Sequence, residues 1–498
     1  MVPLDPVPKP IDHVARGDGD AIALIDRAGT WTFAELEAAV GAVAAWLAAQ
    51  RLHSGDRVAS WLPKTRLACV LPLAVPRAGL VHVPINPALR RAQVTHILAD
   101  SGASLLVTQP TRRATLATGD VPDGCRLADE PALPLSGDGL STSDADTDTL
   151  AAILYTSGST GRPKGVMLSH ANLWLGAIAV AHYLKLDAQD RVLGVLPLSF
   201  DYGQNQLLST WVAGASVAPI DYLTARDVVK AVERVGATTL AGVPPLWVQL
   251  LEVEWPDEIA ARLRRLTNSG GALTPRLVQG LRERFGNADV YAMYGLTEAF
   301  RSTFLPPELI ESHPDSIGRA IPFAEVMAVK VDGNRAVGEP GELVHAGPLV
   351  AQGYWQDPER TAARFRPAPY FAEDRGMAVW SGDTVIEGED GLFRFVGRDD
   401  EMIKSAGNRI SPLEIEAAVL AGGEAREAVA VGVADERLGH GIVVVLAGDP
   451  TAEGVLRARL RTELPSFMQP GRYEWRAELP RNANGKLDRA SIRAQVTR

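Results

Sequence analysis

The sequence predicts an α/β fold with a large N-terminal domain of α/β layers, including a small β unit, and a small α+β C-terminal domain. Three observations support this prediction. Short apolar runs alternate with helical patterns through the first 330 residues, which is typical of a largely parallel sheet. From about residue 325, short segments of alternating polarity are separated by glycine-rich turns, which indicates an antiparallel unit. Beyond these, helical and strand patterns are mixed, so we place the two domains at residues 1–397 and 398–498.

The first helix is predicted from its start signal. Thr32 and Glu35 have the spacing of a capping box, in which the two side chains cap each other's backbone N–H groups. Apolar residues then recur at helical spacing through Leu47, so we expect a helix of about four turns. The next elements are predicted strands at 57–62 and 80–86 and a predicted helix at 88–102.

The later elements follow a polar connection. Residues 134–149 are acidic and rich in Ser, Thr, Gly and Asp, which is typical of a surface segment. An apolar strand is predicted directly after it, at 150–158. The antiparallel segments are 325–331, 341–347 and 393–398. The C-terminal domain is expected to contain helices at 410–421 and 454–464 and strands at 428–435, 441–448 and 472–479.

Composition excludes several classes of protein. Hydrophobic residues make up 46% of the chain and charged residues 22%, which favours a folded, water-soluble protein over a disordered or fibrous one. The net charge of −10 gives no overall positive field for nucleic acid or anionic lipid. The two cysteines, Cys69 and Cys125, are too few for a disulfide framework. With no signal peptide and no apolar run of about 20 residues, we expect a cytoplasmic protein without a membrane span.

A glycine- and hydroxyl-rich segment, YTSGSTGRPKGV at 155–166, is the strongest local signal. Its glycines allow close backbone approach, and its hydroxyl and N–H groups can donate to phosphate oxygens, with Lys164 adding a positive charge. The P-loop pattern does not fit, because Gly165 follows the lysine where that pattern needs Ser or Thr. The segment therefore predicts a different polyphosphate-binding loop. Its expected contacts are Thr156, Ser157, Gly158, Ser159, Thr160 and Lys164.

This segment resembles the signature loop of the adenylate-forming superfamily, which includes acyl-CoA synthetases, peptide-synthetase adenylation domains and luciferases. Further motifs resemble that family in the same order over nearly the whole chain, so the resemblance implies its two-domain fold with a mobile C-terminal domain. These motifs lie at 269–272, 294–298, 380–383, 397–404, 407–410, 464–470 and 480–489.

The resemblance also implies roles for individual residues. Thr297 would contact the α-phosphate of ATP, and Glu298 would help to hold Mg²⁺, a cation that prefers carboxylate oxygens. Lys486 would be the catalytic lysine of the small domain, and Asp400 the hinge between the domains. The remaining nucleotide contacts would be Gly271 and Ala272 against adenine, Asp383 and Arg398 at the ribose, and Tyr294.

The reaction that the resemblance implies has two steps. A carboxylic acid attacks the α-phosphate of ATP to give an acyl adenylate and pyrophosphate, and a thiol then takes the acyl group. The thiol would belong to coenzyme A or to the phosphopantetheine of a carrier protein in trans, because the chain lacks a Gly-Gly-x-Ser attachment motif. Two rival interpretations are a luciferase-like oxygenase and an inactive homologue that acts as a binding module.

The acid is the least determined part of the prediction. Phe200 and Asp201 resemble the Phe-Asp of amino-acid adenylation domains, whose aspartate pairs with the substrate ammonium, but such an aspartate can equally be a loop cap. Arg301 is unexpected in an acyl pocket, and implies either a second carboxylate on the substrate or a structural partner such as an acidic side chain, which we slightly favour. The full predicted pocket is Phe200, Asp201, Gly271, Met293, Arg301 and Ser302.

Four runs of sequence also resemble stand-alone bacterial AMP-forming acyl-CoA ligases of the exosortase-associated type. A plain fatty or aryl acyl-CoA ligase is therefore the alternative to an amino-acid-activating enzyme. The runs lie at 196–203, 241–250, 266–272 and 293–308.

Overall fold

The structure is a computed structural model that describes residues 2–156, 163–398, 401, 403–405, 408–435, 439–464 and 468–497. Five predicted site residues lie outside the described residues. They are Ser157, Gly158, Ser159 and Thr160 of the phosphate-binding segment and the expected hinge residue Asp400.

One of the two sheets of the large domain has six strands in the order β6-β5-β3-β4-β7-β8. All neighbouring strands are parallel except β7 and β8, which form an antiparallel pair. The phosphate-binding segment connects this pair, so the chain reverses at the predicted loop. The strands are β3 (Arg57–Trp61), β4 (Val81–Pro84), β5 (Ala103–Thr108), β6 (Arg126–Asp129), β7 (Leu150–Thr156) and β8 (Lys164–Ser169).

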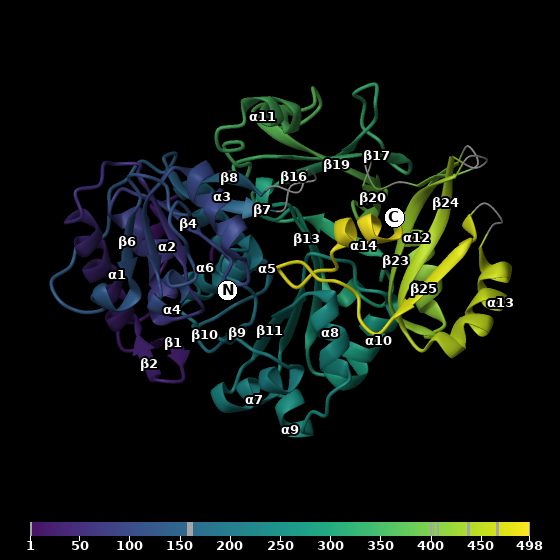
Figure 1. The fold of residues 1–498 in the computed structure, drawn as a ribbon, viewed down its shortest axis with the longest axis horizontal. Helices are drawn as coiled ribbons and strands as arrows, with labels where there is room; N and C mark the ends of the chain where they lie inside the picture. Colours follow the sequence, from purple (N-terminus) through teal and green to yellow (C-terminus); the bar gives the residue numbers. More distant parts are fainter. Residues whose placement is uncertain are drawn as a thin grey trace.

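The other sheet is larger and runs through the centre of the molecule (Figure 1). Its strand order is β16-β17-β19-β20-β15-β14-β13-β12-β11-β9-β10-β1-β2, with β18 beside β19. The segment from β13 to β1 is parallel. Its parallel strands are β1 (Ile22–Asp26), β9 (Arg191–Gly194), β10 (Ser216–Pro219), β11 (Thr239–Gly242), β12 (Arg265–Asn268) and β13 (Asp289–Tyr294), and β2 (Gly29–Thr32) closes that edge.

The small antiparallel unit of the large domain is continuous with the parallel sheet. Strand β14 pairs with β13 on one side and with β15 on the other, so the antiparallel strands continue the parallel sheet. The sequence patterns identified β16, β17 and β20, but not β18 and β19 or the short strands β14 and β15 that join the two parts. The antiparallel strands are β14 (Thr303–Leu305), β15 (Ser316–Ala320), β16 (Glu325–Val329), β17 (Pro340–Ala346), β18 (Phe365–Pro367), β19 (Met377–Glu387) and β20 (Phe393–Arg398).

Helices cover the two sheets, and the first one starts as predicted. Thr32 accepts a hydrogen bond from the backbone N–H of Glu35, whose carboxylate accepts one from the N–H of Thr32. The large-domain helices are α1 (Phe33–Ala48), α2 (Arg66–Arg77), α3 (Arg91–Ser101), α4 (Pro110–Arg113), α5 (His170–Tyr183), α6 (Asp201–Val212), α7 (Ala225–Val235), α8 (Pro244–Leu251), α9 (Asp257–Ala260), α10 (Pro275–Arg284) and α11 (Pro358–Arg364). The shorter 3₁₀ turns are η1 (Ile11–His13), η2 (Glu130–Ala132), η3 (Thr297–Ala299) and η4 (Pro307–Leu309). One apolar core joins helices α1, α2, α5 and α6 to both sheets.

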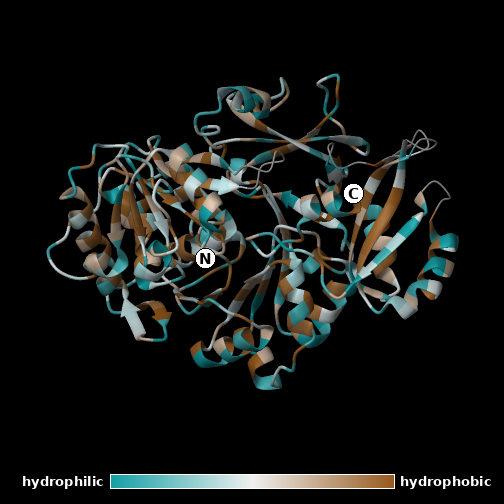
Figure 2. Ribbon diagram, viewed as in Figure 1, coloured by the Kyte–Doolittle hydropathy of each residue, from teal (hydrophilic) through white to brown (hydrophobic). Residues whose placement is uncertain are grey.

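The small domain is built on its own sheet, in the order β22-β21-β24-β23 with β25 beside β24. Alternate residues of the central strands face opposite sides: Ala428 and Ala430 pack under α12 and α13, whereas Val429 and Val431 pack under α14. Apolar colouring follows these strands in Figure 2. The elements are β21 (Ile403–Ser405), β22 (Asn408–Ile410), α12 (Pro412–Ala421), β23 (Ala425–Asp435), β24 (Gly439–Gly448), η5 (Pro450–Ala452), α13 (Glu453–Glu463), β25 (Arg472–Arg476) and α14 (Arg489–Val496).

The segment between β25 and α14 leaves the small domain and reaches the middle of the molecule, where it is drawn in yellow (Figure 1). It carries Lys486. This placement brings a residue from near the end of the chain to the edge of both large-domain sheets. Within the described ranges, no helix combines the length and apolar character of a membrane span.

Candidate active site

Lys164, Glu298 and Tyr354 form a closed hydrogen-bonded group, which we call the Glu298 cluster. The Nζ of Lys164, at the start of β8, donates to Oε1 of Glu298 over 2.9 Å and to the Tyr354 hydroxyl over 2.7 Å. The same hydroxyl donates to Oε1 of Glu298 over 2.6 Å. Burial alone raises the pKa of Glu298, but the Lys164 ammonium and the two hydrogen bonds outweigh it and hold the pKa below its usual value. Glu298 is therefore a buried, ionised carboxylate.

Thr156 lies across the β7–β8 pair from Lys164. Its hydroxyl is buried and has no hydrogen-bond partner among the described residues. Thr297 precedes Glu298 in η3 and is also buried. The structure thus places three predicted phosphate contacts, Thr156, Lys164 and Thr297, around the ends of β7, β8 and β13.

Tyr294, Asp383 and Arg398 form a second group, the Asp383 cluster. The Tyr294 hydroxyl donates to Oδ2 of Asp383 over 2.5 Å, and Nε of Arg398 donates to Oδ1 over 2.7 Å. Asp383 and Arg398 are register partners on β19 and β20, so the antiparallel pairing itself sets their separation. Burial and the neighbouring Asp383 charge raise the pKa of Tyr294 well above its usual value, so the phenol stays a donor.

Lys486 lies partly buried between the domains. Its Nζ lies 4.5 Å from the ring centroid of Phe200, and its side chain runs over Gly270, which has a φ of +81°. A β-carbon on Gly270 would overlap the lysine. The predicted adenine-facing residues Gly271 and Ala272, which follow it, are exposed. Burial lowers the pKa of Lys486 to about 8, although the Asp201 carboxylate acts in the opposite direction.

Asp201 is the first residue of α6 and only 6% exposed. Among the described residues its Oδ1 has no hydrogen-bond partner, whereas the backbone of Tyr202 forms a hydrogen bond with its carboxylate. Asp201 as a loop cap and Asp201 as the partner of a substrate ammonium both remain predictions. Burial raises the pKa of Asp201, while the positive charges of Arg301 and Lys486 lower it. We call Asp201, Arg301 and Lys486 the Asp201 cluster.

Arg301 is 2% exposed, and its partners among the described residues are structural but not acidic. Its Nη1 donates to Oγ of Ser269 over 2.6 Å, and its guanidinium stacks on the Tyr202 ring at 4.7 Å. Its Nε has no partner, and no carboxylate of the described residues lies within ion-pair distance. The Tyr202 ring and the Ser269 hydroxyl offset part of the cost of burying this guanidinium. Sequence patterns do not reveal these two partners.

Phe300 lies along the chain between Glu298 of one cluster and Arg301 of the other. Its φ of +61° is rare for a residue with a side chain, and turns the backbone between Glu298 and Arg301. The remaining predicted pocket residues are buried nearby. Met293 accepts a hydrogen bond from the Tyr183 hydroxyl, and the Ser302 hydroxyl is 3.0 Å from Nδ1 of His345.

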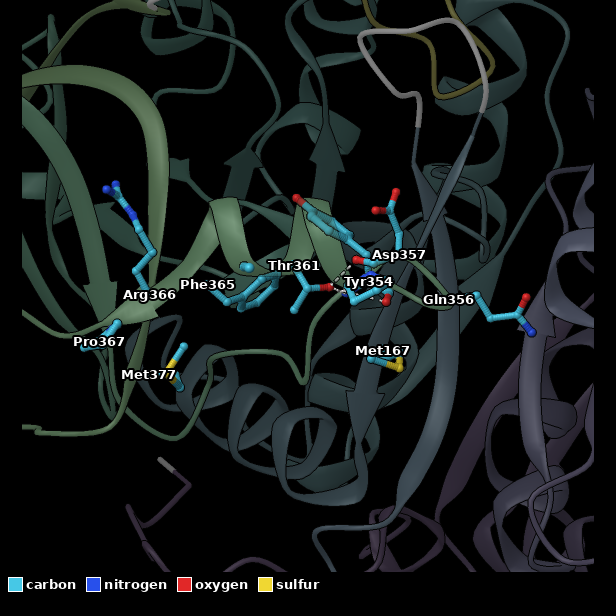
Figure 3. A pocket seen from close by; sticks show the side chains of 11 residues that line it. Met167, Tyr354, Gln356, Asp357, Thr361, Phe365, Arg366, Pro367 and Met377 are labelled. Atoms are coloured by element: carbon cyan, nitrogen blue, oxygen red, sulfur yellow. Dashed lines mark hydrogen bonds between the residues drawn. The ribbon is translucent and has the colours of Figure 1, made fainter.

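A cavity of about 570 Å³ lies beside Tyr354 (Figure 3). It is lined mostly by apolar side chains, including Met167, Phe365 and Met377, and by none of the residues of the Asp383 or Asp201 clusters. At its wall the backbone N–H of Tyr354 donates to Oγ1 of Thr361 over 2.9 Å. This contact fixes the tyrosine that holds Glu298.

Sequence reasoning missed two residues that reach the site. Tyr354 carries no local signal, because it acquires its partners only when β8 and η3 are brought together. Asn86 follows β4 and bonds to the segment of Lys486, as described below. Its position just beyond the carboxyl end of a parallel strand could have indicated it, because functional groups gather at that edge of such sheets.

Comparison with known proteins agrees with this geometry. A family model described as AMP-binding enzyme matches residues 11–355, and one described as AMP-binding enzyme C-terminal domain matches residues 414–486. The chain belongs to the AMP-binding enzyme family. It is thus a member of the AMP-forming acid–thiol ligases, as the motifs predicted, and is related both to peptide-synthetase adenylation domains and to acyl-CoA ligases.

Relatives of both kinds are found. The chain is 31% identical over 494 residues to a linear gramicidin synthase of Brevibacillus parabrevis, covering 95% of this chain and 6% of that protein. It is 32% identical over 474 residues to a feruloyl-CoA synthase of Amycolatopsis, covering 93% of each. The chain therefore spans only a small part of the peptide synthases that it matches.

Solved structures show the same fold as this family member. MatB from Rhodopseudomonas palustris, with ATP bound, matches with a TM-score of 0.88 and 28% identity, over 98% of this chain and 99% of that one. O-succinylbenzoate coenzyme A synthetase from Bacillus subtilis, in complex with ATP and magnesium ion, matches with a TM-score of 0.84 and 26% identity, over 99% and 100%. The predicted fold, with a large α/β domain and a small C-terminal domain, is confirmed.

Proposed function

We propose that this protein uses ATP to convert an amino acid to its acyl adenylate and then transfers the aminoacyl group to a phosphopantetheine thiol. The thiol belongs to coenzyme A or to a carrier protein in trans. The two domains divide at residues 397 and 398, and Asp400 is the hinge between them. Membership of the exosortase-associated ligases remains a prediction from sequence.

The Glu298 cluster suits the phosphate end of ATP. Lys164 supplies a positive charge to the phosphates, and Thr156 and Thr297 supply hydroxyl donors. Magnesium fits here because Glu298 is ionised although buried, and carboxylate oxygen is the ligand type that this cation prefers. When bound, the cation would neutralise part of the negative charge of the phosphates. Among the described residues no group of three or more His, Cys, Asp or Glu could hold a metal, so Glu298 would share the ion with phosphate oxygens.

The Asp383 cluster suits the ribose. Both carboxylate oxygens of Asp383 are already oriented, by Tyr294 on one side and Arg398 on the other. A carboxylate held in this way can accept hydrogen bonds from a pair of neighbouring hydroxyls without reorganising. The exposed backbone at Gly271 and Ala272 leaves room for a flat ring beside it.

Lys486 suits the first of the two reactions. Its ammonium lies between Gly270 and the Phe200 ring, and the small domain must be in the present orientation for it to do so. There it can hold the acid's carboxylate against the α-phosphate and stabilise the negative charge of the transition state. Rotation of the small domain would withdraw the lysine and admit the thiol.

Asp201 carries the proposal that the acid is an amino acid. A buried carboxylate with an unpartnered oxygen is costly unless a cation reaches it. Lys486 is near it now, but that ammonium is needed by the substrate carboxylate and ATP, so a substrate ammonium is the natural partner for Asp201 during the reaction. The similarity to peptide synthases supports this assignment.

A plain acyl-CoA ligase is the second candidate. Arg301 interacts electrostatically with Asp201, so the two charges can offset each other without any substrate ammonium. The similarity to a feruloyl-CoA synthase over nearly its full length also favours this candidate.

Matched substrates distinguish the two. Pyrophosphate release is measured for amino acids and for their deamino analogues of equal length, with the wild type, Asp201→Asn and Asp201→Ala. We expect the wild type to prefer amino acids and both variants to lose about 30- to 5,000-fold in kcat/KM for them, because the substrate ammonium loses its partner. The deamino acids serve as the control and should lose little. A wild type that prefers deamino acids would assign the protein to the plain acyl-CoA ligases.

A further inference from the structure

One side chain of the large domain holds the segment that carries Lys486. Asn86 lies just beyond the carboxyl end of β4 and is 6% exposed. Its Nδ2 donates to the backbone carbonyl of Ala483 over 2.9 Å and to Oδ1 of Asn484 over 3.0 Å. Both acceptors belong to the small domain, so these two hydrogen bonds cross between the domains.

The amide of Asn86 is oriented from its own side. Its Oδ1 accepts a hydrogen bond from the backbone N–H of Ala88 over 2.8 Å. Since that oxygen is fixed by a donor, the nitrogen must face the opposite direction, toward the small domain. The large domain therefore presents a fixed donor pair before the small domain arrives.

The segment of Lys486 is a tight turn that moves as a unit. Oδ1 of Asn482 accepts from the N–H groups of Asn484 and Lys486 over 3.0 and 3.1 Å. The N–H of Asn482 donates to the Lys486 carbonyl over 2.8 Å, and Gly485 has a φ of +79°, which closes the turn. Fixing Ala483 and Asn484 consequently fixes the backbone of Lys486 as well.

The lysine side chain extends from this turn to the Asp201 cluster. Its backbone is set by Asn86 on one side, and its aliphatic chain lies over Gly270 on the other. Small shifts of a catalytic group reduce rates strongly, because the reacting atoms must be held at near-contact distance. A contact that fixes the turn therefore influences the ammonium directly.

We propose that Asn86 is a positioning residue, which holds the Lys486 turn in place for adenylate formation and releases it before thiol transfer. The proposal rests on the role of Lys486 in the proposed function. It predicts that Asn86 matters for the first reaction and not for the second, because the lysine turn has left Asn86 when the thiol enters.

Two substitutions separate this role from a local structural one. Asn86→Asp keeps an oxygen for the Ala88 N–H but replaces the donor by an acceptor, which faces the Ala483 carbonyl and Oδ1 of Asn484. Asn86→Ala removes both functions. If Asn86 serves only its own turn, Asn86→Asp should behave as wild type. If it holds the lysine turn, both variants should be impaired. Asn484→Ala removes one of the two acceptors and should fall between them and the wild type.

The first measurement needs no acid. Acetylation of Lys486 by acetic anhydride, and hydrogen exchange of a peptide spanning 480–488, are followed by mass spectrometry in the ligand-free full-length protein. We expect Lys486 to be labelled about 5- to 100-fold faster in Asn86→Asp than in wild type, with an unchanged melting temperature. Equal labelling rates in the two proteins would overturn the proposal.

The second measurement compares the half-reactions, using whichever acid of the panel releases most pyrophosphate. Adenylate formation should fall about 10- to 100-fold in Asn86→Asp, while thioester formation from synthetic acyl adenylate should stay within about twofold. Equal loss in both reactions would make Asn86 a structural residue of the large domain and overturn the proposal. If Lys486 is labelled faster in Asn86→Asp but adenylate formation is unchanged, the position of Lys486 does not matter for the first reaction. That result would overturn the catalytic part of the proposal. Neither measurement depends on whether the acid is an amino acid.

Discussion

The Glu298 cluster and the Asp201 cluster include residues only three positions apart, Glu298 and Arg301, but their charges are paired differently. In the Glu298 cluster, Lys164 and Glu298 form an ion pair at 2.9 Å that Tyr354 completes. In the Asp201 cluster, the charges of Asp201, Arg301 and Lys486 interact, yet within the part of the chain that the structure describes they form no ion pair at 4.0 Å or less. The charges of Lys164 and Glu298 are paired without a ligand, whereas those of the Asp201 cluster are not.

The difference indicates which parts of the site are built in advance. A closed ion pair keeps its geometry in the free protein, so the magnesium and phosphate contacts can be rigid before ATP binds. Buried charges without direct partners shift their pKa values instead, and their final pairing depends on the substrate. We therefore expect changes in the Asp201 cluster to alter substrate choice and pH dependence, and changes in the Glu298 cluster to alter the magnesium requirement.

Lys486→Ala should have the largest effect. Without the ammonium, adenylate formation should fall by about 10²- to 10³-fold, as when one transition-state donor is removed elsewhere. Thioester formation from pre-made acyl adenylate should change little, because in the proposed function the lysine acts only in the first reaction. Separate assays of the two half-reactions test this, and equal losses in both would contradict it.

Glu298→Gln should come next. The amide leaves the partly buried Lys164 without a compensating charge and removes the ionised oxygen proposed for magnesium. Titration of adenylation against magnesium should show a requirement about 10- to 100-fold higher than in wild type. If the variant needs no more magnesium than wild type, the assignment of Glu298 to the ion is wrong.

A change of pH should have an effect of intermediate size, and this effect should distinguish the two clusters. The pKa of Lys486 is lowered to about 8, so the lysine is charged below that pH and neutral above it. The kcat/KM of adenylation should consequently fall as pH rises above 8, by up to about tenfold per pH unit. Thioester formation from acyl adenylate is the control and should lack this decline. A flat adenylation profile between pH 7 and about 9.5 would show that the lysine stays protonated.

Tyr354→Phe should have the smallest effect. It removes one donor to Glu298 and one acceptor for Lys164, but leaves their ion pair intact. We expect a two- to tenfold rise in the magnesium requirement, which is about the loss of one or two hydrogen bonds. An effect as large as that of Glu298→Gln would mean that the tyrosine, and not the ion pair, maintains the cluster.

Sequence patterns predicted those features of the fold that depend on neighbouring residues. The capping box at Thr32 and Glu35 is present, and the C-terminal helices and strands lie within a few residues of their predicted bounds, although β25 ends at Arg476. The continuity of the central sheet could not be predicted, because β14 has only three residues and little pattern of its own. The place of β14 in the sheet is set by its pairing with β13 and β15. The residues of β14 by themselves do not indicate either pairing.

The same distinction holds in the site. Glu298, Asp383 and Lys486 stand in motifs whose residue order is informative, so they could be named from sequence. The partners of Arg301 could not, because Ser269 and Tyr202 come from separate elements and meet the guanidinium only in the folded protein. Asn86 is similar, since its two acceptors lie almost 400 residues further along the chain.

Gly270 lets Lys486 occupy its present position because the glycine has no side chain. Its φ of +81° disfavours any residue with a side chain, and a β-carbon there would overlap Lys486. A single methyl group at this position would therefore exclude the lysine from its present place without touching the charges around it. The orientation in which the lysine has withdrawn would not meet that methyl group. Gly270→Ala thus offers a way to isolate the thiol-accepting orientation for structural study, because it sorts the two arrangements by volume alone.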